Sequence, residues 1–113
     1  MDTTNETKPI PGWRQADLRS LAIHEALVKK LRENPNLVDV AFANMDRWEK
    51  LGVAKDSWFS HEKWRRLLKG DFDVLLSKMV EDSEEMQQLR SCTPFAGILT
   101  NKERATVIEK TRF

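Results

Sequence analysis

The stretch Gln15–Glu33, with the sequence QADLRSLAIHEALVKKLRE, decides the fold class of this chain. Its apolar side chains recur every three or four residues, which places them on one face of a helix, and charged side chains fill the other face. The apolar face is formed by Leu18, Leu21, Ala22, Leu27, Val28 and Leu31. Asn34 and Pro35 end this helix and start another, because Asn is a favoured N-cap and proline fits the first helical turn. One amphipathic helix of this kind needs further elements to cover its apolar face.

Shorter stretches with the same spacing follow along the chain. We expect helices from Pro35 to about Leu51, from His61 to Lys69, after a cap at Asp71 or Asp73, after a capping box at Asp82 and Glu85, and after a capping box at Thr100 and Glu103. Gly52 is suited to stop the first of them. No stretch alternates as a strand does. The sequence therefore predicts an all-α fold, a compact bundle of five or six short amphipathic helices.

The first twelve residues differ from the rest. They are polar and end in Pro9-Ile10-Pro11-Gly12, which predicts an extended, flexible N-terminal arm. The helical pattern starts after Trp13, and a chain of 113 residues fits one domain. We therefore expect an arm over residues 1–12 and a single helical domain over residues 13–113.

The composition limits the kinds of partner that the chain is expected to bind. Nineteen basic and 18 acidic side chains give a formal net charge of +1, so the chain as a whole does not attract nucleic acid or anionic lipid. No apolar run approaches the ~20 residues of a membrane span. Cys92 is the only cysteine, which excludes an intramolecular disulfide and suits a reducing compartment. We expect a cytoplasmic protein with no membrane partner.

Metal and cofactor sites find no support in the sequence. His24-Glu25 begins like a zinc motif, but Val28 stands where the second histidine belongs. The glycines are scattered, so no phosphate-binding loop is present, and we predict neither a metal nor a cofactor. Cys92, with His24 or His61 as its base, is a formal nucleophile. A lone cysteine beside an apolar stretch is more often a small buried hydrophobe.

Arg19 and His24 carry a pattern of another kind. Arg, four residues and His resemble the catalytic signature of HEPN-type helical ribonucleases. The resemblance implies that His24 transfers a proton and that Arg19 stabilises phosphate charge. A helical ribonuclease is therefore the alternative function. The interpretation we favour is an ordinary solvated arginine and a histidine on a helix face.

Basic side chains also gather on the predicted helix after His61. Lys63, Arg65, Arg66 and Lys69 flank Trp64, and such a helix could contact phosphates in a DNA-binding regulator. This is a second alternative function. Nearby carboxylates dilute the positive field, so a solvated helix face is the simpler interpretation.

The segment Ser91–Thr100, SCTPFAGILT, requires a docking surface. Its proline and glycine argue against a helix, yet its apolar side chains do not suit a solvated loop. It packs either on its own core, which we favour, or on a partner. Trp13 and Trp58 lie at element boundaries and could likewise pack on the core or contact a partner. Trp48 and Trp64 lie in apolar stripes and are expected in the core. The candidate partner-binding residues are Trp13, Trp58, Phe95, Ile98 and Leu99.

The region Leu89–Thr100, followed by Glu103-Arg104, also carries a family resemblance. Together with Asn44–Trp48 it resembles small helical bacterial proteins of unassigned function, some of which accompany toxin–antitoxin genes. The resemblance implies a bacterial, antitoxin-like protein. Our leading hypothesis is a non-enzymatic protein-interaction module that binds a toxin, or a second copy of itself as a homo-oligomer, through an apolar surface.

Overall fold

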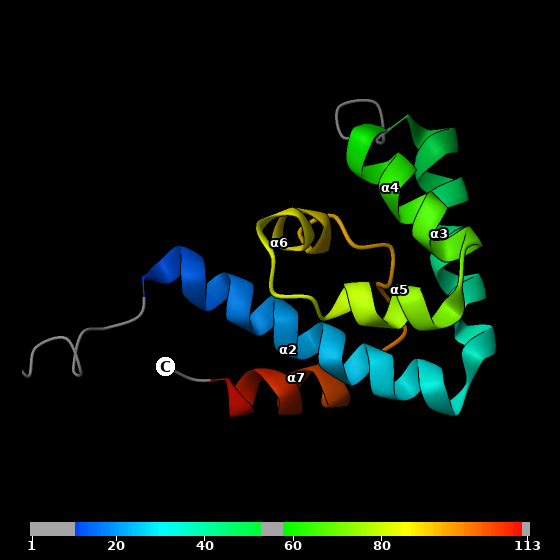
Figure 1. Cartoon of the computed structure of the whole chain (residues 1–113). Coiled ribbons are helices and arrows are strands. Elements are labelled where there is room, and N and C mark those ends of the chain that lie inside the picture. The colour runs from blue at the N-terminus through cyan, green and yellow to red at the C-terminus, as the bar shows by residue number, and fades with distance from the viewer. Residues whose placement is uncertain (1–10, 53–57, 112–113) are drawn as a thin grey trace, which may run out of the picture.

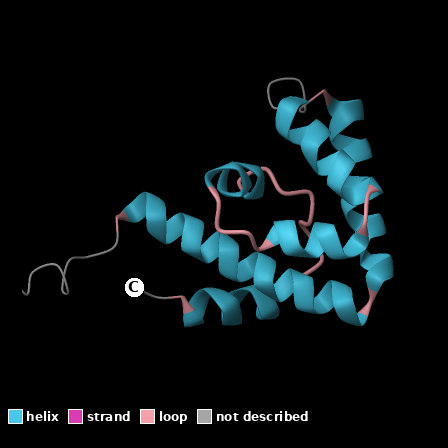
Figure 2. Ribbon diagram, viewed as in Figure 1, coloured by secondary structure: helices cyan, strands magenta, loops and turns pink. Residues whose placement is uncertain are grey.

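The computed structural model describes residues 11–52 and 58–111. Within these ranges the regular structure is entirely helical, which confirms the all-α prediction (Figure 2). The elements are α2 (Gly12–Glu33), the 3-10 turn η1 (Pro35–Leu37), α3 (Val38–Leu51), α4 (Trp58–Lys69), α5 (Phe72–Met79), α6 (Glu84–Arg90) and α7 (Asn101–Lys110). No helix in this part of the chain is both long and apolar enough to cross a bilayer.

The long helix α2 is the centre of the arrangement. Helices α5, α6 and α7 all pack against it, as Figure 1 shows. Helices α3 and α4 form a hairpin; α4 contacts α5 and α6, and the start of α3 is joined to α2 through η1 (Figure 1). The hairpin therefore has one end in the bundle and one free end.

The core lies where these helices meet. Its buried side chains are Leu27, Val28, Leu31, Ala41, Met45, Trp64, Leu68, Leu75, Leu76, Met79, Met86, Leu89, Phe95 and Ile98. Trp64 is 1% exposed, and its indole N–H donates to the Leu89 carbonyl at 2.7 Å, so its one polar atom is satisfied. The prediction of a core tryptophan is confirmed for Trp64, whereas Trp48 is only half-buried.

The segment after α6 docks on this core. Phe95 is 2% exposed and meets the Trp64 ring edge-on, with 5.5 Å between the ring centroids. Ile98 is 5% exposed and Leu99 is half-buried. Gly97 has a φ of 88°, a conformation that favours glycine, and it turns the chain between these residues. The segment therefore packs on its own protein, which is the arrangement favoured above, and Phe95 and Ile98 are buried there.

Asn44 on α3 fixes the path of this segment. Its side-chain amide is almost fully buried and donates to the carbonyls of Pro94 and Ala96, each at 2.9 Å. Its carbonyl oxygen accepts from Arg47 at 2.8 Å. One side chain thus satisfies two backbone groups in a stretch that has no ladder or helix to satisfy them.

Asn44→Ala is expected to lower the free energy of unfolding by about 2 kcal/mol, because a buried carbonyl left without a donor costs about 1–3 kcal/mol. Chemical denaturation of the wild type and the variant measures the difference. Asn101→Ala, at an exposed position of α7, is the matched control and should change the value by less than about 0.5 kcal/mol. Equal effects at both positions would contradict the role given to Asn44.

Arg90 joins the ends of α5 and α6 in a similar way. Its guanidinium is 2% exposed, and one nitrogen donates to the carbonyls of Met79 and Glu81 at 3.1 and 2.8 Å. The Met79 carbonyl lies in the last turn of α5 and the Glu81 carbonyl just after it, where helical partners are missing. A buried arginine here is a structural clamp on the turn that leads into α6.

Several element boundaries differ from those expected. Helix α2 begins at Gly12 and not at Gln15, so Gly12 belongs to the helix and not to the arm, while residues 1–10 lie outside the described residues. The turn at Pro35 is a 3-10 turn before α3. Helix α4 begins at Trp58 and not at His61, and residues 53–57 of the expected connection lie outside the described part.

Three of the predicted caps are confirmed and two are not. Asn34 precedes Pro35 at the start of η1 but makes no side-chain cap hydrogen bond, and α3 itself follows Leu37. Gly52 ends α3 in the left-handed conformation, Asp71 caps α5, and Thr100 forms a complete capping box at α7. Helix α6 is capped by Ser83, whose hydroxyl accepts from the Met86 amide, and not by Asp82. The Asp82 carboxylate pairs instead with Arg14 on α2 at 3.0 Å.

Candidate functional site

Large apolar side chains are exposed at the free end of the α3–α4 hairpin. Leu51 ends α3 and is 68% exposed, and the first two residues of α4, Trp58 and Phe59, are 51% and 73% exposed. We call these three residues the hairpin tip. The tip lies at the end of the hairpin remote from α2 (Figure 1). Trp58 was among the predicted partner-binding residues, whereas Leu51 and Phe59 were not.

Polar contacts beneath the tip hold Trp58 in place. Its indole stacks on the His61 ring, with 5.3 Å between centroids and 22° between planes. His61 is 5% exposed and its Nε2 lies 3.0 Å from a Glu49 carboxylate oxygen on α3. Arg65 adds ion pairs to Asp46 at 3.0 Å and Glu49 at 3.2 Å. The two helices are therefore clasped together directly under the exposed tryptophan.

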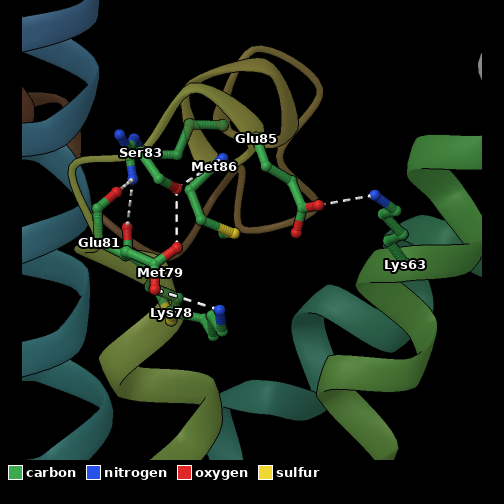
Figure 3. Close-up of polar contacts among 8 residues, drawn as sticks. Lys63, Lys78, Met79, Glu81, Ser83, Glu85 and Met86 are labelled. Carbon is green, nitrogen blue, oxygen red and sulfur yellow. Dashed lines mark hydrogen bonds and ion pairs between the residues drawn. The ribbon is translucent and has the colours of Figure 1, made fainter.

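A groove adjoins the tip on the side of α4 that faces α5 and α6. It has a volume of about 260 Å³ and is lined by Lys63, Arg66, Leu67, Lys78, Glu85, Met86 and Leu89. Figure 3 shows Lys63 on α4 reaching across to Glu85 on α6, an ion pair of 2.9 Å. The Lys63 ammonium also lies 4.5 Å from the centre of the Phe59 ring. Small-molecule pockets measure ~300–1,000 Å³, so this groove suits one or two side chains better than a cofactor.

The predicted basic surface is largely neutralised. Lys63 pairs with Glu85, Arg65 with Asp46 and Glu49, and Arg66 with Glu62 at 3.7 Å. Lys63 and Arg65 also reach different neighbours, α6 and α3 respectively. Together with Lys69 these side chains do not form one phosphate-binding face, so the geometry does not support the DNA-binding alternative.

His24 is held inside the protein. It is 1% exposed, and its Nδ1 lies 2.8 Å from the Ser20 carbonyl. Because a carbonyl only accepts, we assign the proton to Nδ1, and Nε2 then accepts from the Thr93 hydroxyl at 2.9 Å. Burial lowers the pKa of His24 from 6.5 to about 4, against the opposing effect of the Ser20 carbonyl, and the charge of Arg90 lowers it further. His24 is therefore a neutral structural residue near pH 7.

Arg19 does not join His24 in a catalytic pair. Residues five apart on an α-helix point about 140° from each other at ~100° per residue. His24 faces the core, whereas Arg19 is half-buried. Both ring nitrogens of His24 are already occupied, so the ribonuclease alternative has no exposed acid or base here.

Cys92 lies in an ordinary structural environment. The thiol lies 3.5 and 3.7 Å from the carbonyls of Leu89 and Gln88, an ordinary contact for a half-buried cysteine after a helix. Among residues 11–52 and 58–111, no three His, Cys, Asp or Glu side chains are grouped so that they could hold a metal ion.

Trp13 is exposed at a different place. It is 69% exposed in the first turn of α2 and borders a hollow of about 380 Å³ with residues of α6. The start of α2 and the hairpin tip lie at opposite sides of the molecule (Figure 1). The five predicted partner-binding residues are thus separated: Trp13 and Trp58 are exposed at distant sites, Phe95 and Ile98 are inside, and Leu99 is half-buried.

Comparison with known proteins identifies no relative from which a function could be transferred. No family model matches the chain, and no curated protein or solved structure is significantly similar to it.

Proposed function

We propose that the protein is a non-enzymatic interaction module that binds a protein partner through the hairpin tip. The observation that carries the proposal is the exposure of Trp58 and Phe59, neighbours in the sequence at the start of α4, together with that of Leu51 at the end of α3. Aromatic side chains supply much of the binding energy at protein interfaces, because they bury a large area with few rotatable bonds. Apolar side chains grouped in this way mark an interaction site more often than single exposed ones do.

The rigidity of the tip also supports the proposal. Trp58 is stacked on a buried histidine, and the hairpin below is joined by the ion pairs of Arg65. A side chain that is already ordered loses less entropy on binding than a free one. The hairpin therefore presents the Trp58 ring in a fixed arrangement.

Two partners are candidates, and only the first of them follows from the sequence resemblance. One is a bacterial toxin, which would make this protein antitoxin-like, and the other is a second copy of the chain. Burial of Trp58 and Phe59 would stabilise either complex. Sedimentation distinguishes them, because a dimer that the tip variant described below dissociates identifies the second copy as the partner.

Replacing both tip aromatics, as Trp58→Ser with Phe59→Ser, is expected to weaken partner binding at least tenfold, since loss of an interface hot spot costs about 2 kcal/mol or more. The full-length variant and the wild type are used as bait in lysate of the source organism, and recovered proteins are quantified by mass spectrometry. The affinity for the purified partner is then measured directly.

Val74→Ser is the matched control, because Val74 is 51% exposed on α5, outside the tip. It should leave partner recovery within twofold of the wild type, and circular dichroism should show that all three proteins are folded. Equal recovery of every protein by the wild type and the tip variant would contradict the proposal.

A further inference from the structure

We propose that the groove beside the tip binds an acidic amphipathic segment of the partner, in which one large apolar side chain is flanked by carboxylates. This inference rests on the proposed function, since it specifies the chemistry of the partner. The groove is the surface defined above by residues of α4, α5 and α6.

The charged side chains of the groove wall favour an occupant that carries negative charge. Three of its lining side chains are cations, Lys63, Arg66 and Lys78, and Glu85 is its single carboxylate. Glu62 and Glu81, which pair with Arg66 and Lys78, do not line the groove. Cations therefore outnumber carboxylates on the groove wall itself, although each of the three already has an ion-pair partner within the protein.

The ion pairs of these cations are exchangeable. The Arg66 side chain is 83% exposed and lies 3.7 Å from Glu62, and Lys78 and Glu81 are each 40% exposed. Exposed pairs contribute little to stability, so a carboxylate of the partner can replace the internal one at little loss. The Lys63–Glu85 pair links the α4 and α6 walls, and an incoming carboxylate that takes Lys63 from Glu85 would widen the groove.

The floor of the groove requires an apolar anchor. Leu67 is half-buried and supplies apolar surface between the cations, and Met86 and Leu89 lie beneath it, almost completely covered. A methionine adapts readily to different shapes, which allows Met86 to move as a side chain enters. The volume of about 260 Å³ accommodates one large side chain.

Phe59 makes the groove continuous with the tip. It lies one helical turn before Lys63 on α4, and the Lys63 ammonium covers its ring. A partner that contacts the tip through Phe59 is therefore adjacent to the groove. Carboxylates on the occupant would complement Lys63 at this junction and the other two cations farther along.

Selection from a displayed library of random 12-residue peptides on the full-length protein tests this inference. We expect enrichment of peptides with a large apolar residue within four positions of at least two Asp or Glu residues. The most enriched sequence is then synthesised, and its binding is measured by fluorescence anisotropy. Arg66→Glu with Lys78→Glu should weaken binding at least tenfold.

The matched control is Lys102→Glu with Lys110→Glu, which changes the net charge equally on the exposed surface of α7. It should change the affinity less than twofold. In the wild type labelled at methionine methyl groups, the peptide should shift the Met86 signal and leave that of the core residue Met45 in place. Enrichment without an acidic bias, equal weakening by the two double variants, or an unmoved Met86 signal would overturn the inference.

The tip variant and the groove variant distinguish a failure of the proposed function from a failure of the groove inference. If the tip variant loses the natural partner while Arg66→Glu with Lys78→Glu retains it, the proposed function holds and the groove inference is wrong. If acidic peptides bind the groove but the tip variant retains every natural partner, the groove inference holds and the assignment of the tip is wrong.

Discussion

Replacing Phe95 with alanine is expected to lower the free energy of unfolding by about 3–5 kcal/mol, the range for a buried aromatic side chain. Phe95 is 2% exposed and contacts the rings of Trp64 and His24 edge-on, with centroid distances of 5.5 and 6.3 Å. Its removal leaves a cavity in a segment whose backbone is held by hydrogen bonds from Asn44 to the Pro94 carbonyl and from the Trp64 indole to the Leu89 carbonyl. A loss of this size is a large fraction of the ~5–15 kcal/mol that stabilises a typical domain.

Phe59→Ala is the matched control, because it removes the same side chain from a position that is 73% exposed. We expect a change of less than about 0.5 kcal/mol there. Urea unfolding, followed by tryptophan fluorescence, measures both variants. Similar effects for the two substitutions would show that the segment around Phe95 is not part of the core.

Acidification from pH 7 to pH 4 is expected to destabilise the protein by about 3 kcal/mol through His24 alone. Burial holds the pKa of this histidine at about 4, compared with 6.5 for an ordinary histidine. Between these values the unfolded chain binds a proton that the folded protein excludes, so stability falls as the pH falls. A pKa difference of about 2.5, at 1.36 kcal/mol for each pH unit, gives the stated magnitude.

The difference between the wild type and His24→Gln isolates this effect. A glutamine does not titrate, so its unfolding free energy should fall less between pH 7 and pH 4, while every other group contributes equally to both proteins. Glu103 affects stability at lower pH than His24 does. The hydrogen bonds that it accepts from Lys30 and from the Thr100 backbone lower its pKa to about 2. Parallel curves for the two proteins from pH 7 to pH 4 would contradict the burial of His24.

The helices and most of their ends could be predicted because their signals are local. The apolar spacing in Gln15–Glu33, the capping box of Thr100 with Glu103 and the stop at Gly52 all act within a few residues. The cap of α6 was misassigned because Asp82 and Ser83 are neighbouring cap formers. The pairing of Asp82 with Arg14, 68 residues away, decides between them and has no local signal.

The candidate site could be predicted only in part. Trp58 was identified by its place at an element boundary, and Phe59 could have been identified because it falls outside the apolar stripe of Trp64 and Leu68. The inward path of Phe95 depends on Asn44, which lies 50 residues before Pro94 in the chain. Contacts over such separations leave no periodic pattern in the sequence. The sequence alone therefore could not decide whether this segment packs on its own core or on a partner.

Site-specific photo-crosslinking in cells of the source organism tests the role of the hairpin tip most directly. p-Benzoylphenylalanine is placed at position 59, where it keeps an aromatic ring at the tip, and in a second protein at position 74 on α5. We predict that irradiation links a partner protein to position 59 and not to position 74. The absence of a crosslink at position 59, or recovery of the same protein from both positions, would contradict the assignment of the tip as the partner-binding surface.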